Sequence, residues 1–257
     1  AAGLGTRFRP ATYEVPKPMV PLCNRPLMDY AAETMVTAGV QELIVNLHHL
    51  PDPIRDYMDR HFGSRCKLQF SLEEEILGTG GGVRRVRSLL EQEEDFFLLN
   101  GDTIQFPSLP ELKVSRREGN ALAALLLREP PESDRFTRVF FDYGRINGFG
   151  EGTGQTLMFA GAHCISRRIF DLLPDREFSG ITEDVYLPAV RQKSATLSGV
   201  RYDGPWFDIG TPSRYLSASE SISTLMLGGE LKPPTGSRAD QQRKSILSDS
   251  CRIEGDV

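Results

Sequence analysis

The sequence lacks several features on which common functional classes depend. Its four cysteines include no CxxC pair, so a zinc site is not indicated, and we predict reduced thiols in a cytoplasmic protein. The longest strongly apolar run, ALAALLL at residues 121–127, is far too short to cross a bilayer. A formal net charge of -5 and a pI near 5.5 argue against a general binder of nucleic acids or acidic membranes. Any cationic site must therefore be local, and we expect neither nucleic acid nor membrane as a partner.

The familiar phosphate-binding motifs are also missing from the N-terminal segment, AAGLGTRFRPATYEVPKPMVP. It has neither the Gly-Lys-Ser/Thr ending of a Walker loop nor the third glycine of a dinucleotide fingerprint. Instead it combines glycines and cations with almost no acid. Gly3 and Gly5 allow backbone amides to face an anion, while Arg7 adds a forked cation and Lys17 a point charge. The segment predicts a polyphosphate site; the alternative is a surface loop that happens to hold two cations.

Over its whole length this segment resembles the signature of the sugar-1-phosphate nucleotidylyltransferases. That signature runs A-G-x-G-T-R-x-x-P-x-T, then P-K-P and a further proline, and such dense spacing makes the match specific. The resemblance implies an enzyme acting on a nucleoside triphosphate and a sugar 1-phosphate, with Arg7 and Lys17 as catalytic residues. It also implies that LGTGGG at residues 77–82, otherwise a flexible turn, helps to enclose the nucleotide. The residues expected to contact the nucleotide are Ala2, Gly3, Gly5, Thr6, Gly78 and Thr79.

Two aspartates are candidates for metal binding. Asp102 follows FFLLN, which predicts a buried strand, and open α/β sheets bind ligands at the carboxyl ends of their strands. By itself the Asn-Gly-Asp sequence is more typical of a turn, and Asp208 in WFDIGTP can be explained as shaping the turn before a helix. The resemblance makes Asp102 and Asp208 the two ligands of Mg²⁺, which is the expected cofactor.

Three further residues align with the sugar-binding side of the family. Gly161, in FAGAHCIS, matches a glycine whose backbone faces the sugar, with strand packing as the alternative. Glu151 matches the glutamate of an E-K-P element, but glycine and threonine follow it here. Asp184, in ITEDVYLP, matches a family acid, although a place in the first turn of a helix explains it equally well. The identity of the sugar therefore stays open.

Strand and helix signals alternate in the first half of the chain. Apolar runs at residues 42–47, 66–71 and 96–100 predict buried strands. Helices are predicted to start at Pro26 and Pro53, and Thr79 is predicted to cap a third. This order predicts an α/β fold with a doubly wound, mostly parallel sheet, a Rossmann-like nucleotidyltransferase fold.

The second half is less regular. Strands are predicted at residues 121–127, 138–142 and 156–160, and Thr211 is predicted to cap a helix that begins at Pro212 and runs to about Leu227.

Composition divides the chain into three expected parts. Residues 1–227 form the catalytic domain, and the Gly, Pro and Ser content of residues 228–243 predicts a linker. Apolar residues recur at roughly six-residue intervals in residues 244–257, as at the start of a left-handed β-helix; an ordinary strand or tail is the alternative. A β-helix would favour a homo-oligomer. The family also carries a buried strand ahead of AAG, which we expect in the full protein.

The remaining charged and titratable residues receive no functional role. His48 and His49 are adjacent, so on a strand they would point to opposite faces. The acidic clusters at residues 73–75 and 91–95 are predicted to be solvated surface.

The reaction implied by the resemblance is attack of a sugar-1-phosphate oxygen on the α-phosphorus of a nucleoside triphosphate, with pyrophosphate as the leaving group. The nucleophile is already an anion, so no general base is needed. The favoured substrates are mannose 1-phosphate and GTP; the alternative is uridylyl or thymidylyl transfer to N-acetylmuramate 1-phosphate or another sugar 1-phosphate. An alternative of another class is a non-catalytic regulatory subunit that binds nucleotide-sugars, which could lose Lys17, Asp102 or Asp208.

Overall fold

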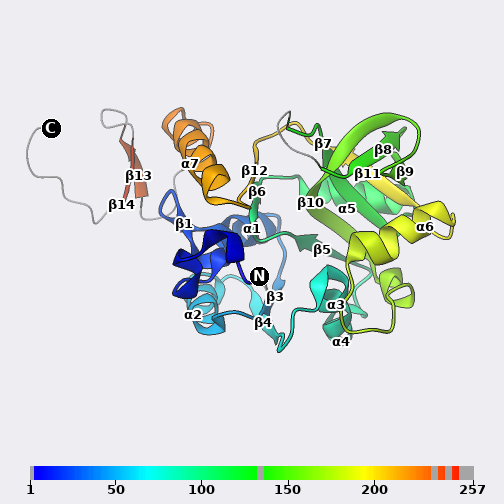
Figure 1. Cartoon of the computed structure of the whole chain (residues 1–257), viewed down its shortest axis with the longest axis horizontal. Coiled ribbons are helices and arrows are strands. Elements are labelled where there is room, and N and C mark those ends of the chain that lie inside the picture. Colours follow the sequence, from blue (N-terminus) through cyan, green and yellow to red (C-terminus); the bar gives the residue numbers. More distant parts are fainter. Residues whose placement is uncertain (1–2, 132–135, 233–236, 241–244, 249–257) are drawn as a thin grey trace, which may run out of the picture.

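The computed structural model describes residues 3–131, 136–232, 237–240 and 245–248. Figure 1 shows the N-terminal segment and α7 (Pro212–Leu227) on one side of the molecule and the largest sheet on the other. Within this described part of the chain, no helix is long and apolar enough to span a bilayer, and Cys23, Cys66 and Cys164 are free thiols.

The largest sheet has six strands in the order β5-β10-β7-β11-β9-β8. Their bounds are Asp95–Leu99 for β5, Ala123–Arg128 for β7, Arg138–Asp142 for β8, Arg145–Phe149 for β9, Gln155–Ser166 for β10 and Leu197–Arg201 for β11. Only the β7–β11 pairing in this sheet is parallel, and every other one is antiparallel. A separate parallel pair consists of β3 (Glu42–Leu47) and β4 (Lys67–Leu72). The α/β class is confirmed, whereas a mostly parallel sheet is wrong.

The physical reason for the mixed sheet lies in the short connections of the second half. Strands β8 and β9 are joined by Tyr143 and Gly144, whose φ values of 46° and 78° are both positive. Two positive φ angles in a two-residue loop are the geometry of a tight hairpin, which can only join antiparallel strands. β10 then pairs with β8 as well as with β7, so one long strand replaces the short one predicted at residues 156–160.

Both faces of the six-stranded sheet are covered, as the alternation along β7 shows. Ala123, Leu125 and Leu127 pack into one apolar cluster with residues of α3 (Gly78–Arg85) and of the turn Thr182–Tyr186. Ala124 and Leu126 pack against α5 (Leu109–Glu118) on the other face. Period-two alternation between two apolar environments makes a strand apolar throughout. This burial explains why ALAALLL is a strand and not a helix.

Seven α-helices occur in the described residues. They are α1 (Leu27–Thr37), α2 (Pro51–Phe62), α3 (Gly78–Arg85), α4 (Arg87–Leu90), α5 (Leu109–Glu118), α6 (Leu187–Arg191) and α7 (Pro212–Leu227). Thr211 caps α7 by accepting a hydrogen bond from the Arg214 N–H, as predicted. The prediction for Thr79 is wrong, because α3 already begins at Gly78 and Thr79 lies inside it.

A second apolar cluster holds the N-terminal segment against the rest of the molecule. Phe8 and Leu22 pack with Ile104 of β6 (Thr103–Gln105), with Ile209 and with Ile222 of α7. Strand β6 pairs antiparallel with β12 (Trp206–Asp208), and β1 (Pro21–Leu22) pairs with β2 (Arg25–Pro26). Parts of the chain that are distant in sequence therefore meet around one core.

Two acids predicted to be solvated surface are buried. The Asp95 side chain is 1% exposed and lies 2.5 Å from Arg116 Nε and 2.8 Å from Arg117 Nε. Glu73 accepts hydrogen bonds from the Asn46 amide and from the Leu77 N–H. Buried carboxylates need such partners, and a run of acids in a sequence does not show which member has them.

The C-terminal part forms a hairpin where it is described. β13 (Ser237–Asp240) pairs antiparallel with β14 (Ser245–Ser248), so a strand occurs inside the segment predicted to be a linker. A β-helix start is not shown by the described residues, and residues 249–257 lie outside them. The division into domain, linker and repeat stays a prediction.

The core of the six-stranded sheet contains one buried histidine. His163 of β10 is 1% exposed, and its Nδ1 lies 2.9 Å from the hydroxyl of Tyr186. Burial lowers the pKa of His163 to about 3 because the charged ring cannot be solvated there. The folded protein therefore holds this imidazole neutral at neutral pH.

We expect this histidine to make stability depend on pH. Below its ordinary pKa of 6.5, the unfolded chain gains a proton that the folded chain cannot accept until about pH 3. Unfolding free energy is therefore lost as the pH falls from about 6.5 to about 3, by up to about 1.4 kcal/mol per pH unit from this group. Denaturant unfolding of the wild type and His163→Gln should give curves that diverge below pH 6.5, relative to their difference at pH 8. If the difference in unfolding free energy between the two proteins stays the same from pH 8 to low pH, His163 is not held neutral by burial.

Candidate active site

The N-terminal segment folds into three short 3₁₀ turns around Gly5. Gly5 has a φ of 61°, and a Cβ there would lie 2.9 Å from the Cβ of Lys17, so only glycine fits this turn. The Thr12 hydroxyl donates to the Gly5 carbonyl at 2.9 Å, and the His49 Nε2 donates to the Thr12 carbonyl at 2.8 Å. Gly3 has open space around it, whereas Ala2 lies outside the described residues. The segment is thus a fixed structure and not a loose loop.

Lys17 occupies the third of these turns (Lys17–Met19) and is buried. Its side chain is 10% exposed, and its Nζ lies 2.6 Å from Asp102 Oδ2. The ammonium also lies 5.8 Å from the centre of the Phe8 ring. The Asp102 side chain is 44% exposed, so this ion pair is buried on the lysine side and open to solvent on the carboxylate side.

Strand pairing places Asp208 beside Asp102. Asp208 at the end of β12 is in register with Thr103 at the start of β6, and the Ile209 N–H donates to the Asp102 carbonyl at 3.0 Å. The two predicted metal ligands, far apart in sequence, therefore lie side by side at one end of the β6–β12 pair.

Two arginines border Asp208. A Cβ at Gly210 would lie 3.1 Å from Asp208 Oδ1 and 3.2 Å from Arg7 Nη1, which puts the Arg7 guanidinium close to this carboxylate. In addition, Arg214 Nη1 forms an ion pair with Asp208 Oδ2. The site therefore combines three cations (Arg7, Lys17, Arg214) with two carboxylates.

Burial and a neighbouring negative charge both raise the pKa of Asp208 above its ordinary value. Loss of hydration is the larger cause, and the charge of Asp102 adds to it, whereas Arg214, Lys17 and Arg7 act in the opposite direction. Each of these groups thus faces Asp208 at close enough range to affect its ionisation. The predicted catalytic and metal-binding residues form one electrostatic cluster.

The donor set of this cluster fits a magnesium ion that also binds substrate. Within the described residues, no group of three or more His, Cys, Asp or Glu side chains could hold a metal alone. Magnesium commonly takes one or two carboxylates and completes its shell with water and substrate phosphates. Asp102 and Asp208 supply that number of carboxylates.

The glycines of LGTGGG have a packing function. The Gly80 N–H donates to the Ser179 carbonyl at 2.8 Å, and a Cβ at Gly81 would lie 2.2 Å from the Glu177 carbonyl oxygen. The Thr79 hydroxyl accepts from the Ile181 N–H at 3.0 Å. Segment 177–181 therefore lies directly on the start of α3, which side chains would prevent. Nucleotide contact by Gly78 and Thr79 stays a prediction.

The three predicted sugar-binding residues lie in different surroundings and have different partners. Gly161, with a φ of 94°, accepts a hydrogen bond from the Asn100 N–H at 2.9 Å, so it lies beside the turn that carries Asp102. Asp184 accepts from the Gly180 N–H at 2.9 Å and from Arg176. Both contacts lower the pKa of Asp184. The hydrogen bond from the Arg176 guanidinium is the larger cause, and the one from the Gly180 N–H is the second.

Glu151 is separated from the other candidates in its contacts. It lies between β9 and β10 with its side chain 80% exposed, and it pairs with Arg191 at 2.9 Å. In the described structure it has no hydrogen bond or ion pair with the cluster around Asp102.

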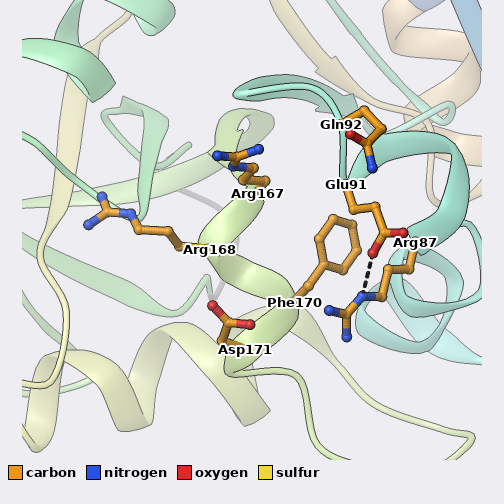
Figure 2. Close-up of a pocket in the computed structure, with 7 residues that line it drawn as sticks. All are labelled: Arg87, Glu91, Gln92, Arg167, Arg168, Phe170 and Asp171. Carbon is orange, nitrogen blue, oxygen red and sulfur yellow. Dashed lines mark hydrogen bonds and ion pairs between the residues drawn. The ribbon is translucent and has the colours of Figure 1, made fainter.

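Two hollows of the described structure lie outside this cluster. One hollow, of about 290 Å³, is lined by Arg87, Glu91 and Phe170 among others. In Figure 2 the guanidinium of Arg87 is paired with Glu91 beside the Phe170 ring. Arg168 points away from the Phe170 ring and donates to the carbonyls of Asn120 and Ala121. A second hollow, of about 340 Å³, lies beside Gly81 and Glu177. The Asp102 side chain is instead open to solvent, with 44% of it exposed.

Comparison with known proteins decides the family. The model of the family described as nucleotidyl transferase matches residues 1–224. The chain belongs to this family. Its N-terminal segment, both aspartates and the Gly161 bend all lie within the matched residues.

Individual nucleotidyl transferases resemble the chain in sequence and in fold. The mannose-1-phosphate guanyltransferase beta-B of Xenopus laevis is 31% identical over 225 residues, which cover 84% of this chain and 61% of that protein. HddC from Yersinia pseudotuberculosis, solved in complex with GMP-PN, is 25% identical with a TM-score of 0.71, over 86% of this chain and 96% of HddC. An apo UDP-glucose pyrophosphorylase is 19% identical with a TM-score of 0.74, over 87% and 96% of the two chains. The last similarity concerns the fold alone.

The first relatives are longer than this chain. It spans 62% of the length of the mannose-1-phosphate guanyltransferases at the top of the comparison. The match to the family covers the residues that build the cluster.

The sequence-based prediction missed one member of this charged cluster, Arg214. A signal was present, because a basic residue in the first turn of a helix is electrostatically unfavourable unless an acid or another anion compensates it. Arg214 follows the Thr211 cap by three residues, and Asp208 is the acid that compensates it.

The packing function of the glycines predicts a stability loss on substitution. Gly81→Ala should lower the free energy of unfolding by about 1–3 kcal/mol, because the methyl group would overlap the Glu177 carbonyl. Helix propensity alone would make the alanine variant more stable. Packing and helix propensity therefore predict opposite changes in the free energy of unfolding. The matched control is Gly101→Ala, where a methyl group meets nothing within 4 Å. Denaturant unfolding in which Gly81→Ala equals or exceeds the wild type would refute the packing role.

Proposed function

We propose that the chain catalyses transfer of a nucleoside monophosphate from a nucleoside triphosphate to a sugar 1-phosphate, with release of pyrophosphate. The observation that carries this proposal is the Lys17–Asp102 ion pair, 2.6 Å long, with Asp208 and Arg7 beside it in a chain of the nucleotidyl transferase family. The grouping supplies cations and carboxylates at one open site, which is the chemistry that phosphoryl transfer between two anions requires.

Charge repulsion is the main barrier that the protein residues must lower. Two unit charges about 4 Å apart repel by about 4 kcal/mol at an effective dielectric constant of 20, and several such pairs must meet. Arg7 binds the β- and γ-phosphates that leave as pyrophosphate. Lys17 binds the α-phosphate and the incoming sugar phosphate. The attacking phosphate oxygen is already ionised, so the protein's contribution is position and positive charge.

Backbone and carboxylate groups complete the proposed site. The amides of the Gly3–Thr6 turn hold phosphate oxygens, and Asp102 and Asp208 hold Mg²⁺. That ion would supply positive charge that offsets the charge of the phosphates. We expect the Gly161 backbone and Asp184 to contact the sugar phosphate. Gly78 and Thr79 are expected to contact the nucleotide. Glu151 joins the sugar side only if its exposed side chain leaves Arg191.

The favoured substrates are GTP and mannose 1-phosphate. Sequence relatives at 27–31% identity are named mannose-1-phosphate guanyltransferases, and HddC, at 25% identity, was solved with GMP-PN. Uridylyl or thymidylyl transfer to another sugar 1-phosphate is the alternative. A non-catalytic regulatory subunit is less well supported, because it would have no need to keep the Lys17–Asp102 ion pair with Asp208 beside it.

Pyrophosphate release over a panel of nucleoside triphosphates and sugar 1-phosphates tests the proposal and names the substrates. Lys17→Met should lower turnover by about 10²–10³, because it removes the ammonium and keeps the side-chain volume. Asp102 is solvated enough to lose its partner without unfolding the protein. Lys67→Met, at an exposed ion pair with Glu42, is the control and should retain full turnover. Near-native turnover of Lys17→Met would rule out the assigned role, and silence of the wild type over the whole panel would favour the regulatory alternative.

A further inference from the structure

Arg214 occupies a position that helix stability does not explain. It is the third residue of α7, which begins at Pro212, and its N–H donates to the side chain of the Thr211 cap at 3.3 Å. The unsatisfied N–H groups at a helix start carry partial positive charge, so a cation in this turn is electrostatically unfavourable. The guanidinium must therefore be stabilised by something outside the helix.

That stabilising contact is Asp208. Arg214 Nη1 is paired with Asp208 Oδ2, and the two side chains are 32% and 22% exposed. The guanidinium also lies 5.9 Å from the centre of the Phe136 ring. Arg214 is thus half-buried at the open site and pairs with the same carboxylate that is proposed to hold Mg²⁺.

Each of the two carboxylates of the site is paired with a cation of its own. Asp102 is paired with Lys17, and Asp208 is paired with Arg214. Each candidate metal ligand therefore already has a cation of the protein as its partner. A divalent ion that takes these carboxylate oxygens must compete with both partners, and the cations that it releases remain beside the place where phosphates arrive.

We propose that Arg214 is a resident counter-ion of Asp208 which a divalent metal displaces, and that the displaced guanidinium then binds a phosphate group of the substrates. This inference rests on the proposed function for the identity of the phosphate compounds. A guanidinium is suited to this exchange because its planar donors match carboxylate and phosphate oxygens equally well. Metal binding and phosphate binding would thereby be coupled through one side chain.

The exchange predicts opposite effects of one substitution on two ligands. Removing the guanidinium removes a competitor of the metal, so Arg214→Gln should bind Mn²⁺ about two- to fivefold more tightly in the absence of substrate. The same variant should bind inorganic triphosphate about tenfold more weakly in the presence of saturating Mn²⁺, because a charged donor is lost. A purely structural arginine would not give a gain for one ligand and a loss for the other.

The experiment uses the full chain and titration calorimetry with Mn²⁺ and then with inorganic triphosphate. Glutamine at position 214 preserves the helix start, because Thr followed three residues later by Gln is a favourable capping pair. Arg214→Lys keeps the charge but loses the planar donors, so both of its affinities should lie between those of the wild type and those of Arg214→Gln. Arg65→Gln, which removes an arginine paired with Glu33 at 2.7 Å, is the control and should change neither affinity.

The outcomes separate this inference from the proposed function. Unchanged or weaker Mn²⁺ binding by Arg214→Gln, unchanged triphosphate binding, or absence of Mn²⁺ binding by the wild type would each overturn the exchange. Neither measurement requires turnover. If the opposite shifts are found but no pyrophosphate is released from any substrate pair, the exchange stands and the catalytic proposal fails.

Discussion

The contact between the Lys17 ammonium and the Asp102 carboxylate is the interaction on which the organisation of the site depends. It joins the N-terminal segment to the turn that follows β5, and these two parts meet only because Phe8 and Ile104 share one apolar cluster with α7. Hydrophobic packing thus supplies the free energy that brings like and unlike charges to one place. Without that core, the charges would be unconnected surface groups.

The site also shows how a small domain can hold opposite charges at high density. Lys17 is buried and Asp102 is exposed, so the lysine is kept in position while the carboxylate stays accessible. Asp208 is held beside it by strand pairing, which fixes the backbone and not the side chain. The cluster is thus buried on the lysine side and open on the carboxylate side, which suits the proposed electrostatic catalysis by preorganised groups.

Individual helices and strands, and the types of residue in the cluster, were predicted from the sequence more accurately than the topology of the sheet was. Helix α7 with its Thr211 cap and strand β3 at residues 42–47 are as predicted, because capping chemistry and apolar runs are local signals. The mixed sheet was missed because it depends on the Tyr143–Gly144 hairpin, whose left-handed backbone angles have no strong signal in a Tyr-Gly pair. Contacts between distant elements could not be predicted from the sequence either, since the burial of Asp95 depends on Arg116 of another element.

The most direct test of the account is metal-dependent binding of a nucleoside triphosphate analogue that cannot be cleaved between its α- and β-phosphates. The account predicts that Mg²⁺ tightens binding of this analogue to the wild type, and that the Asp102→Asn, Asp208→Asn double variant loses this increment while it keeps the metal-independent part that Arg7 and Lys17 provide. Calorimetric titrations with and without Mg²⁺ measure both parts. A double variant that keeps the full Mg²⁺-dependent increment would contradict the claim that these two carboxylates form the metal site.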